Sequence, residues 1–258
     1  MTEKEADKRL KKIGEEIRLS ISKGKDKPKP TSNINNAHKD RNIGVDTINK
    51  LIGVSESYQA PDKLWDIMLD KHKRERLFDK FLEIEHKVGY DWFQDYFEAV
   101  QADRKKKKQD FTPNTVSKLT HRLIGDSKDY FEPTAGTGGM LIKKWQQDRM
   151  KHSPFTYRPH MYFYRLEELG DSAIAFLIFN MAIRGMNGTI FYGDSLSREC
   201  KQVFFIQNDT DEPERYSSVN VMPRTDTVEK YFDVASWMPK YPAVEHVESG
   251  KTVIKGAV

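Results

Sequence analysis

The stretch DYFEPTAGTGGMLIKKW, residues 129–145, decides the fold of this chain. Tyr130 and Phe131 are typical of the end of a strand, residues 133–139 turn the chain, and Met140 opens an apolar helix. Three glycines in this turn leave it almost without side chains, so a bulky ligand can lie against bare backbone. The unpaired N–H groups at the start of the helix favour a polar ligand. The stretch therefore predicts a strand, a turn and a helix of an α/β fold.

A glycine-rich turn of this kind has several interpretations. It can hold a dinucleotide, a phosphate or a methyl donor, or it can be a plain tight turn. The order Gly-Thr-Gly-Gly lacks the G-x-G-x-x-G spacing of dinucleotide folds, and no Lys-Ser or Lys-Thr pair follows as in a phosphate-binding P-loop. The methyl-donor site and the plain turn therefore stay open.

Composition describes a water-soluble globular chain with tails. The 258 residues are 37% hydrophobic and 32% charged, which leaves room for one sizeable core. No apolar run is long enough to cross a bilayer, and the first residues, MTEKEADKRLKK, lack the apolar core of a signal peptide. We therefore expect a cytoplasmic protein without a membrane partner. The net charge of +4 permits nucleic-acid binding through local patches but does not require it.

Metal and disulfide chemistry are not expected. Cys200 is the only cysteine, so no intrachain disulfide and no cage of thiolate ligands can form. The seven histidines are scattered without the pairing that metal ligands show. The sequence therefore predicts no metal site.

Three regions follow one another along the chain. Residues 1–60 are predicted to be a flexible basic arm, in which residues 46–52 form one or two helical turns at most. The lysines of this arm either track a phosphate backbone or serve only as solvated surface. Residues 61–103 carry aromatic residues at helical spacing and predict a helical subdomain, for which packing is a sufficient explanation. Residues 104–258 are predicted to form the α/β domain.

Acidic side chains follow two further predicted strands. The strand at residues 161–166 ends at Glu167 and Glu168, where an acid can accept hydrogen bonds from ribose hydroxyls. The strand at residues 189–192 runs into Asp194, although an aspartate there is also an ordinary helix-capping residue. Because strand, loop and acid recur in order, we expect a mostly parallel sheet with one shared pocket beyond the carboxyl ends of its strands.

Residues 132–141, EPTAGTGGML, resemble the S-adenosylmethionine-binding motif of N6-adenine DNA methyltransferases, most closely that of the modification subunit of type I restriction systems. The resemblance implies a Rossmann-like S-adenosylmethionine-dependent methyltransferase fold with an N-terminal helical subdomain. It also implies S-adenosyl-L-methionine as cofactor and DNA as partner. It extends over about residues 62–209 and is strongest at 129–141 and 164–196.

The resemblance assigns roles to individual residues. Asn180 completes an E-x(11)-N pattern that selects Glu168, rather than Glu167, to hold the cofactor ribose, and Asp194 in G-D-S-L would meet the amine of the cofactor adenine. Residues 109–113, QDFTP, resemble the Q-F-(F/Y)-T-P element that folds over the methyl donor, and Asp110 departs from that element. Without the resemblance, these residues are typical of an ordinary capped helix start. The remaining cofactor-binding residues implied are Phe111, Thr112, Pro113, Glu132, Pro133, Thr134, Gly136, Gly138 and Gly139. The basic run at residues 104–108 adjoins this element and is either solvated surface or close to DNA.

The predicted fourth strand, residues 202–207, leads to a departure from the family. Active members carry (D/N/S)-P-P-(Y/F) at its end, where the first side chain accepts from the target amine and the ring stacks on a flipped adenine. Here Asn208 is followed by Asp-Thr-Asp, so both prolines and the ring are missing. We expect Asn208 to be the catalytic residue that orients the amine, and a ring could come from Trp237 or Tyr216.

Two functions follow from this pattern. The first is an S-adenosylmethionine-dependent DNA methyltransferase, in which positioning of the adenine N6 amine and of the donor supplies most of the acceleration. The second is a catalytically inactive or altered methyltransferase-like binding protein that acts on DNA or on a restriction or other defence complex, a role that suits a small, stand-alone, phage-like chain. Methylation of a substrate other than adenine is a third possibility.

Overall fold

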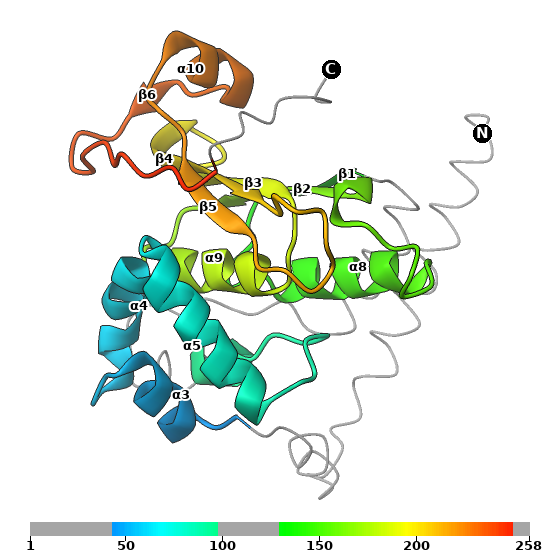
Figure 1. Ribbon diagram of the computed structural model, residues 1–258. Coiled ribbons are helices and arrows are strands. Elements are labelled where there is room, and N and C mark those ends of the chain that lie inside the picture. Colours follow the sequence, from blue (N-terminus) through cyan, green and yellow to red (C-terminus); the bar gives the residue numbers. More distant parts are fainter. Residues whose placement is uncertain (1–42, 98–128, 250–258) are drawn as a thin grey trace, which may run out of the picture. The chain divides into compact units, whose positions relative to one another are not determined.

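The protein is described by a computed structural model over residues 43–97 and 129–249 (Figure 1). The helices are α3 (Val45–Ile52), η1 (Ser57–Gln59), α4 (Ala60–Met68), α5 (Lys71–Ile84), α8 (Gly139–Met150), η2 (Pro159–Met161), α9 (Ile174–Ile183) and α10 (Asp226–Phe232). The strands are β1 (Asp129–Glu132), β2 (Phe163–Glu168), β3 (Gly188–Gly193), β4 (Glu199–Gln207), β5 (Ser218–Val221) and β6 (Ser236–Trp237). None of the described helices is both long enough and apolar enough to cross a membrane.

The strands form one sheet in the order β1-β2-β3-β4-β5, and β6 pairs with the start of β4. Pairings β1–β2, β2–β3 and β4–β6 are parallel, whereas β4 runs antiparallel to both β3 and β5. The prediction of an α/β fold with a mostly parallel sheet is therefore confirmed. The carboxyl ends of β1, β2 and β3 meet along one side of the sheet, here called the carboxyl edge. Because β4 is antiparallel, its beginning lies at this edge and its end lies at the opposite one.

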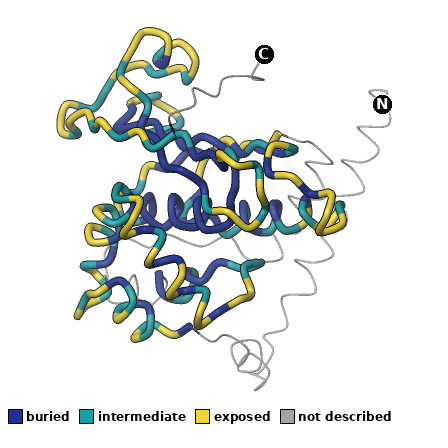
Figure 2. Tube along the Cα trace, in the orientation of Figure 1, coloured by how far each residue is buried: buried dark blue, intermediate teal, exposed yellow. Residues whose placement is uncertain are grey.

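Helix α9 is the centre of the core. Every residue of this helix is buried, as its almost uniformly apolar sequence predicts. It lies with α8 along one face of the sheet and is covered on its other side by α4 and α5 (Figure 1). Figure 2 shows the buried residues concentrated along α9 and strands β3 and β4. Each fully buried large apolar side chain stabilises the fold by about 1.5–3 kcal/mol, so α9 fixes the sheet relative to the helices.

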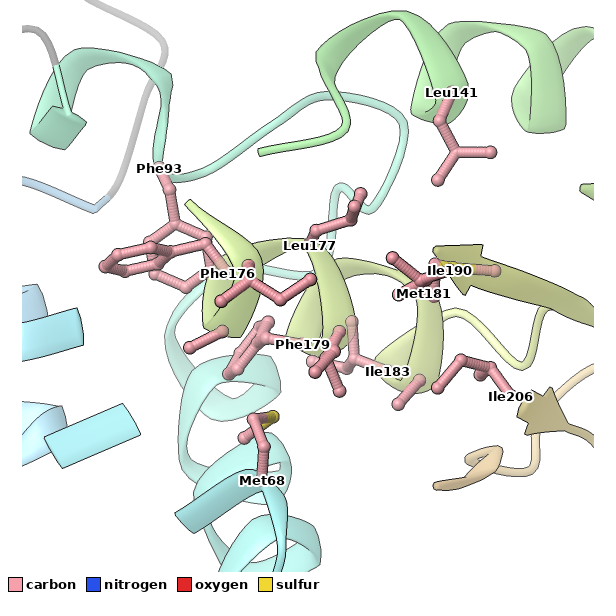
Figure 3. Close-up of a cluster of buried hydrophobic side chains, with 14 of the residues drawn as sticks. Met68, Phe93, Leu141, Phe176, Leu177, Phe179, Met181, Ile183, Ile190 and Ile206 are labelled. Carbon is pink, nitrogen blue, oxygen red and sulfur yellow. The ribbon is translucent and has the colours of Figure 1, made fainter. Parts of the chain in front are cut away.

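Aromatic contacts join the helices before the sheet to α9. Phe78 and Phe81 meet Phe179 edge to face, with ring centroids 4.7 and 4.9 Å apart, and Phe93 packs 4.7 Å from Phe176. Figure 3 shows Phe93, Phe176 and Phe179 in one cluster with Met68 from α4. Helical residues and sheet residues thus share one hydrophobic core, and no boundary at residue 103 divides the described part of the chain.

Helices α3 and η1 lie before residue 60, within the range predicted to be a flexible arm. The chain divides between Arg41 and Asn42, and α3 lies within the larger unit. Ile48 and Ile52 of α3 are buried in the core. Burial of these two side chains stabilises an eight-residue helix, which is too short to be stable on its own.

A buried ion pair links α5 to residues 244–249, here called the C-terminal strap. Arg74 of α5 places Nη1 and Nη2 at 2.7 and 2.5 Å from the carboxylate oxygens of Glu248. The strap is held to β5 because the N–H of Val221 donates to the carbonyl of His246 at 2.7 Å. Both charged groups of the ion pair are almost fully buried, so each depends on the other for its stabilisation.

Candidate functional site

The carboxyl edge brings together the three segments that follow β1, β2 and β3. The N–H of Gly136, in the turn after β1, donates to Oε2 of Glu168 at 2.6 Å. The hydroxyl of Ser195, in the turn after β3, donates to the carbonyl of Pro133 at 2.7 Å. These contacts join residues 133–139, here called the glycine loop, to the acid at the end of β2 and to the turn that carries Asp194. The structure therefore places the candidate residues of three motifs at one site.

Glu168 and its neighbour Glu167 have different surroundings. The buried carboxylate of Glu168 accepts from Gly136 N–H at 2.6 Å and from Gly170 N–H at 2.5 Å. A carboxylate has about four acceptor positions, so Glu168 keeps capacity for ligand hydroxyls. The carboxylate of Glu167 accepts from Nη1 of Arg198 at 2.8 Å instead. Of the two acids, Glu168 is thus the one that contacts the glycine loop.

Glu132 closes β1 as a buried acid. Its Oε2 accepts from the hydroxyl of Tyr130 at 3.1 Å, and its side chain is removed from solvent. Burial raises the pKa of Glu132 to about 8, and the charge of Glu168 acts in the same direction. Most molecules therefore hold Glu132 protonated at pH 7. A cationic group placed beside it would favour the ionised form.

The glycine loop owes its shape to two left-handed residues. Gly136 has φ +57° and Gly138 has φ +94°, values that other residues adopt at a cost. A Cβ added at Gly138 would also lie 3.0 Å from Cδ1 of Leu177, so α9 packs closely under the loop. Pro133 and Thr134 are exposed on the outer side of the loop. Gly139 then begins α8, whose first N–H groups point toward the carboxyl edge.

Asp194 caps the turn between β3 and β4. Its Oδ1 accepts from the N–H groups of Leu196 at 2.8 Å and Ser197 at 3.3 Å. These two bonds hold the pKa of Asp194 below its ordinary value, so the side chain is an anion. Leu196, next to it, is 94% exposed. The turn therefore presents a fixed carboxylate and an apolar side chain together.

Asn208 does not lie at the carboxyl edge, where its predicted catalytic role would place it. Its N–H donates to Oδ1 of Asn187 at 2.8 Å, just before β3 begins. Its side-chain amide donates to the carbonyls of Gly185, Glu212 and Arg215 at 3.4, 2.8 and 3.1 Å. Residues 194–198 alone connect β3 to β4, whereas a parallel connection needs a crossover of about a dozen residues or more. The short connection therefore makes β4 antiparallel and carries Asn208 to the far edge.

Other predicted positions lie apart from the site or outside the described residues. Phe111, Thr112, Pro113 and the basic run at 104–108 fall outside the described ranges. The ring of Tyr216 packs 5.0 Å from Phe78 and its hydroxyl donates to Asp79, so it belongs to the helical layer. Within residues 43–97 and 129–249, no group of three metal-binding side chains is arranged to hold an ion.

Arg198 is a residue of the site that the sequence motifs did not identify. It is the last residue of the turn after β3, where its φ is a left-handed +59°. Its side chain reaches the end of α10. Its Nη1 donates to Glu167, its Nη2 donates to the carbonyl of Phe232 at 2.7 Å, and its guanidinium lies 4.2 Å from the ring centroid of Phe191. Arg198 thereby fixes the turn that carries Asp194. A lone arginine in a turn gives no sequence signal of this role.

Asp91 is a second residue that sequence patterns missed. It follows α5 in a loop, yet its Oδ2 accepts from the hydroxyl of Thr137 in the glycine loop at 2.5 Å. Forty-six positions separate the two residues along the chain, and no spacing rule connects them. Asn180 has no predicted role beyond its place in the E-x(11)-N pattern. Its side-chain amide donates to Asp91 at 3.0 Å.

Comparison with known proteins adds one finding. A family model for N-6 DNA methylases matches residues 88–220. This range contains the glycine loop, Glu168, Asp194 and Asp91. A search among curated proteins found no significant match.

Proposed function

Because the chain belongs to the N-6 DNA methylase family, we propose that it binds S-adenosyl-L-methionine at the carboxyl edge and methylates adenine N6 in DNA. The observation that carries the proposal is the 2.6 Å hydrogen bond from Gly136 N–H to Glu168, which joins the glycine loop to the acid at the end of β2. In α/β sheets, ligands bind beyond the carboxyl ends of parallel strands. A Rossmann-like donor-binding arrangement of β1, β2 and β3 is part of this proposal.

The residues present fit such a donor. Its ribose offers two hydroxyls, and Glu168 keeps acceptor capacity for them. Its adenine carries an amine, and Asp194 is a fixed anion beside the apolar Leu196. Its methionine portion carries an ammonium group, and the buried Glu132 gains its charge at lower pH when a cation lies beside it. The glycine loop supplies the bare backbone against which these parts can lie.

In this proposal, the residues of the chain position the methyl donor. When bound, S-adenosylmethionine supplies an electrophilic methyl group. Glu168 orients the ribose, Asp194 orients the adenine, and Glu132 with the glycine loop and the start of α8 holds the methionine end. Phe111, Thr112 and Pro113 are proposed to fold over the donor, as the resemblance implies. Fixing the donor in one pose lowers the entropy that the reaction has to lose.

The residues that the resemblance implies for the target base do not lie at the carboxyl edge. Asn208 lies at the far edge, and its amide hydrogens are used by three backbone carbonyls. Asp209 accepts from the hydroxyls of Ser218 and Ser249, so it is bound at that edge as well. This observation favours a second candidate function, a methyltransferase-like protein that binds the donor and acts on DNA or on a restriction or other defence complex without methyl transfer.

Calorimetry with S-adenosylmethionine tests the shared part of both candidates. We expect wild type to bind, and we expect Glu168→Ala to bind about 5- to 150-fold more weakly, since lost hydrogen bonds to a charged group cost about 1–3 kcal/mol. Glu212→Ala is the matched control, because Glu212 is an acid that pairs with Arg215 at the opposite edge of the sheet. Absence of binding by wild type would remove both candidates. Equal binding by Glu168→Ala would remove the ribose assignment.

Transfer of a tritiated methyl group to mixed-sequence DNA separates the two candidates. Incorporation into N6-methyladenine by wild type, lost in Glu168→Ala at donor concentrations near the wild-type Kd, supports the enzyme. Donor binding without incorporation supports the binding protein. Incorporation into a different base would keep methyl transfer and overturn adenine as the target.

A further inference from the structure

A buried acid outside the recognised motifs contacts the glycine loop. Asp91 is 6% exposed, and its carboxylate accepts from three donors. Oδ2 accepts from the hydroxyl of Thr137 at 2.5 Å, and Oδ1 accepts from the N–H of Phe93 at 2.9 Å and from Nδ2 of Asn180 at 3.0 Å. A Cβ added at Gly139 would lie 3.9 Å from Oδ2, so the carboxylate lies directly under the start of α8.

Thr137 is held from both ends. Its hydroxyl donates to Asp91, and its carbonyl accepts from Nδ2 of Asn180 at 2.7 Å. The same amide hydrogen-bonds to both Asp91 and Thr137, so the three residues form a closed triangle. Thr137 immediately precedes Gly138, whose φ of +94° turns the loop into α8. The triangle therefore fixes the peptide group at the point where the loop changes direction.

Arg184 extends this triangle back to the segment that carries Asp91. Its Nη1 donates to Oδ1 of Asn180 at 2.8 Å, and its Nε and Nη2 donate to the carbonyls of Val88 and Tyr90 at 2.8 and 2.9 Å. The backbone on the amino side of Asp91 is thereby fixed to α9. The loop after α5, the glycine loop and α9 form one buried hydrogen-bonded network. Networks of this kind hold one arrangement when every member is satisfied, and each member here has its partners.

Burial of a carboxylate is unfavourable, so packing alone does not explain why position 91 is an aspartate. Desolvation raises the pKa of Asp91, while its three donors and the charge of Arg184 act in the opposite direction. An apolar side chain of similar size would avoid the desolvation, but it would leave the Thr137 hydroxyl without its acceptor and would remove one of the two acceptors of the Asn180 amide. What only the carboxylate provides is a fixed acceptor for a side chain of the glycine loop.

We propose that Asp91 is a positioning residue that holds the glycine loop, through Thr137, in the conformation that binds the methyl donor. The inference rests on the proposed function and adds to it that the segment at residues 88–93 is a working part of the donor site. Asp91 acts through Thr137 and does not itself touch the donor. Loss of its contact releases the loop, which then has to be ordered again when the donor binds.

Variants at Thr137 test this proposal without altering the acid. Thr137→Val keeps the shape but removes the hydroxyl, whereas Thr137→Ser keeps the hydroxyl. We expect the Kd for S-adenosylmethionine to rise roughly tenfold in Thr137→Val and to stay within about twofold of wild type in Thr137→Ser. Tyr216→Phe is the matched control, because it removes one hydrogen bond, to Asp79, in the helical layer and does not belong to this network. Asp91→Asn, which keeps the size of the acid, should raise the Kd as well.

Three measurements on the full-length chain distinguish positioning from simple stability. Kd is measured by calorimetry at a temperature well below the unfolding midpoint of every variant, and that midpoint is measured separately. Hydrogen exchange of the backbone amides at 134–139 should increase in Thr137→Val while exchange in α9 stays as in wild type. A lowered midpoint with unchanged Kd and unchanged loop exchange would overturn the proposal.

The outcomes also separate this inference from the proposed function. If wild type fails to bind the donor, the proposed function is wrong and the loop exchange alone decides whether Asp91 holds the loop. If wild type binds and Thr137→Val binds equally well, the donor site stands and the role of Asp91 is wrong. If Asp91→Asn does not fold, the comparison of Val with Ser at Thr137 still gives the answer.

Discussion

Replacement of Glu132 by glutamine should make the stability of the protein less dependent on pH. Burial raises the pKa of Glu132 from its ordinary 4.5 to about 8 in the folded chain. Below pH 4.5 the carboxyl is neutral in both the folded and the unfolded chain, so the stability contribution of the raised pKa is fully present. As pH rises toward 8, the unfolded chain ionises freely while the folded chain cannot, and this stability is progressively lost.

The size of the effect follows from the two pKa values. One pKa unit corresponds to about 1.4 kcal/mol, so the rise in pKa corresponds to an upper limit of about 5 kcal/mol of stability lost between pH 4.5 and pH 8. Glu132→Gln keeps the shape and can still accept from the Tyr130 hydroxyl, but it does not titrate. The variant should therefore be as stable as wild type near pH 4.5 and more stable than wild type by about 2–5 kcal/mol at pH 8.

Urea denaturation at half-unit steps from pH 4.5 to pH 8.5 measures this difference. Glu167→Gln is the control, since Glu167 is paired with Arg198 rather than isolated. A difference between Glu132→Gln and wild type that stays constant across this pH range would refute the argument, because it would mean that Glu132 titrates normally. The same logic predicts that wild type binds S-adenosylmethionine more tightly as pH rises from 6 to 8, with release of a proton on binding.

Three further substitutions give sharp expectations. Gly138→Ala should lower the free energy of unfolding by about 1–2 kcal/mol in urea titrations, because its φ is +94° and the new Cβ would lie 3.0 Å from Leu177; unchanged stability would mean that the loop adopts another conformation. Asn208→Ala should cost about 1–3 kcal/mol by thermal unfolding and leave the donor Kd unchanged, so a selective loss of donor binding would contradict its placement at the far edge. Glu248→Ala should cost about 3–5 kcal/mol in urea, since it leaves the buried charge of Arg74 unpaired, and a loss below about 1 kcal/mol would show that the C-terminal strap does not close on α5.

Local patterns predicted the elements that form the carboxyl edge. The strand, turn and helix at residues 129–145, the apolar α9 and the strands before Glu168 and Asp194 are all present in the structure. Each is encoded by residues close together in sequence, through glycine conformations, hydrophobic periodicity or an acid at a strand end. For the same reason the sequence predicted that Glu168 and Asp194 lie on one side of the sheet.

The features that were missed depend on distant partners. The direction of β4 follows from the short connection at residues 194–198, whereas the catalytic role of Asn208 at the end of this strand was implied by the resemblance. Asp91 and Thr137 meet only because α9 brings the loop after α5 under α8. Such pairings are decided by how the elements pack, which no local window contains.

The ion pair between Arg74 and Glu248 has a consequence for how the chain is made. A ribosome adds Glu248 174 residues after Arg74. At synthesis rates of about 5–20 residues per second, Glu248 is added about 10–35 s after Arg74. During that interval α5 cannot bury Arg74 without an uncompensated charge, so the nascent helical layer stays open until the strap emerges. Final closure of this layer therefore requires that the strap has left the ribosome.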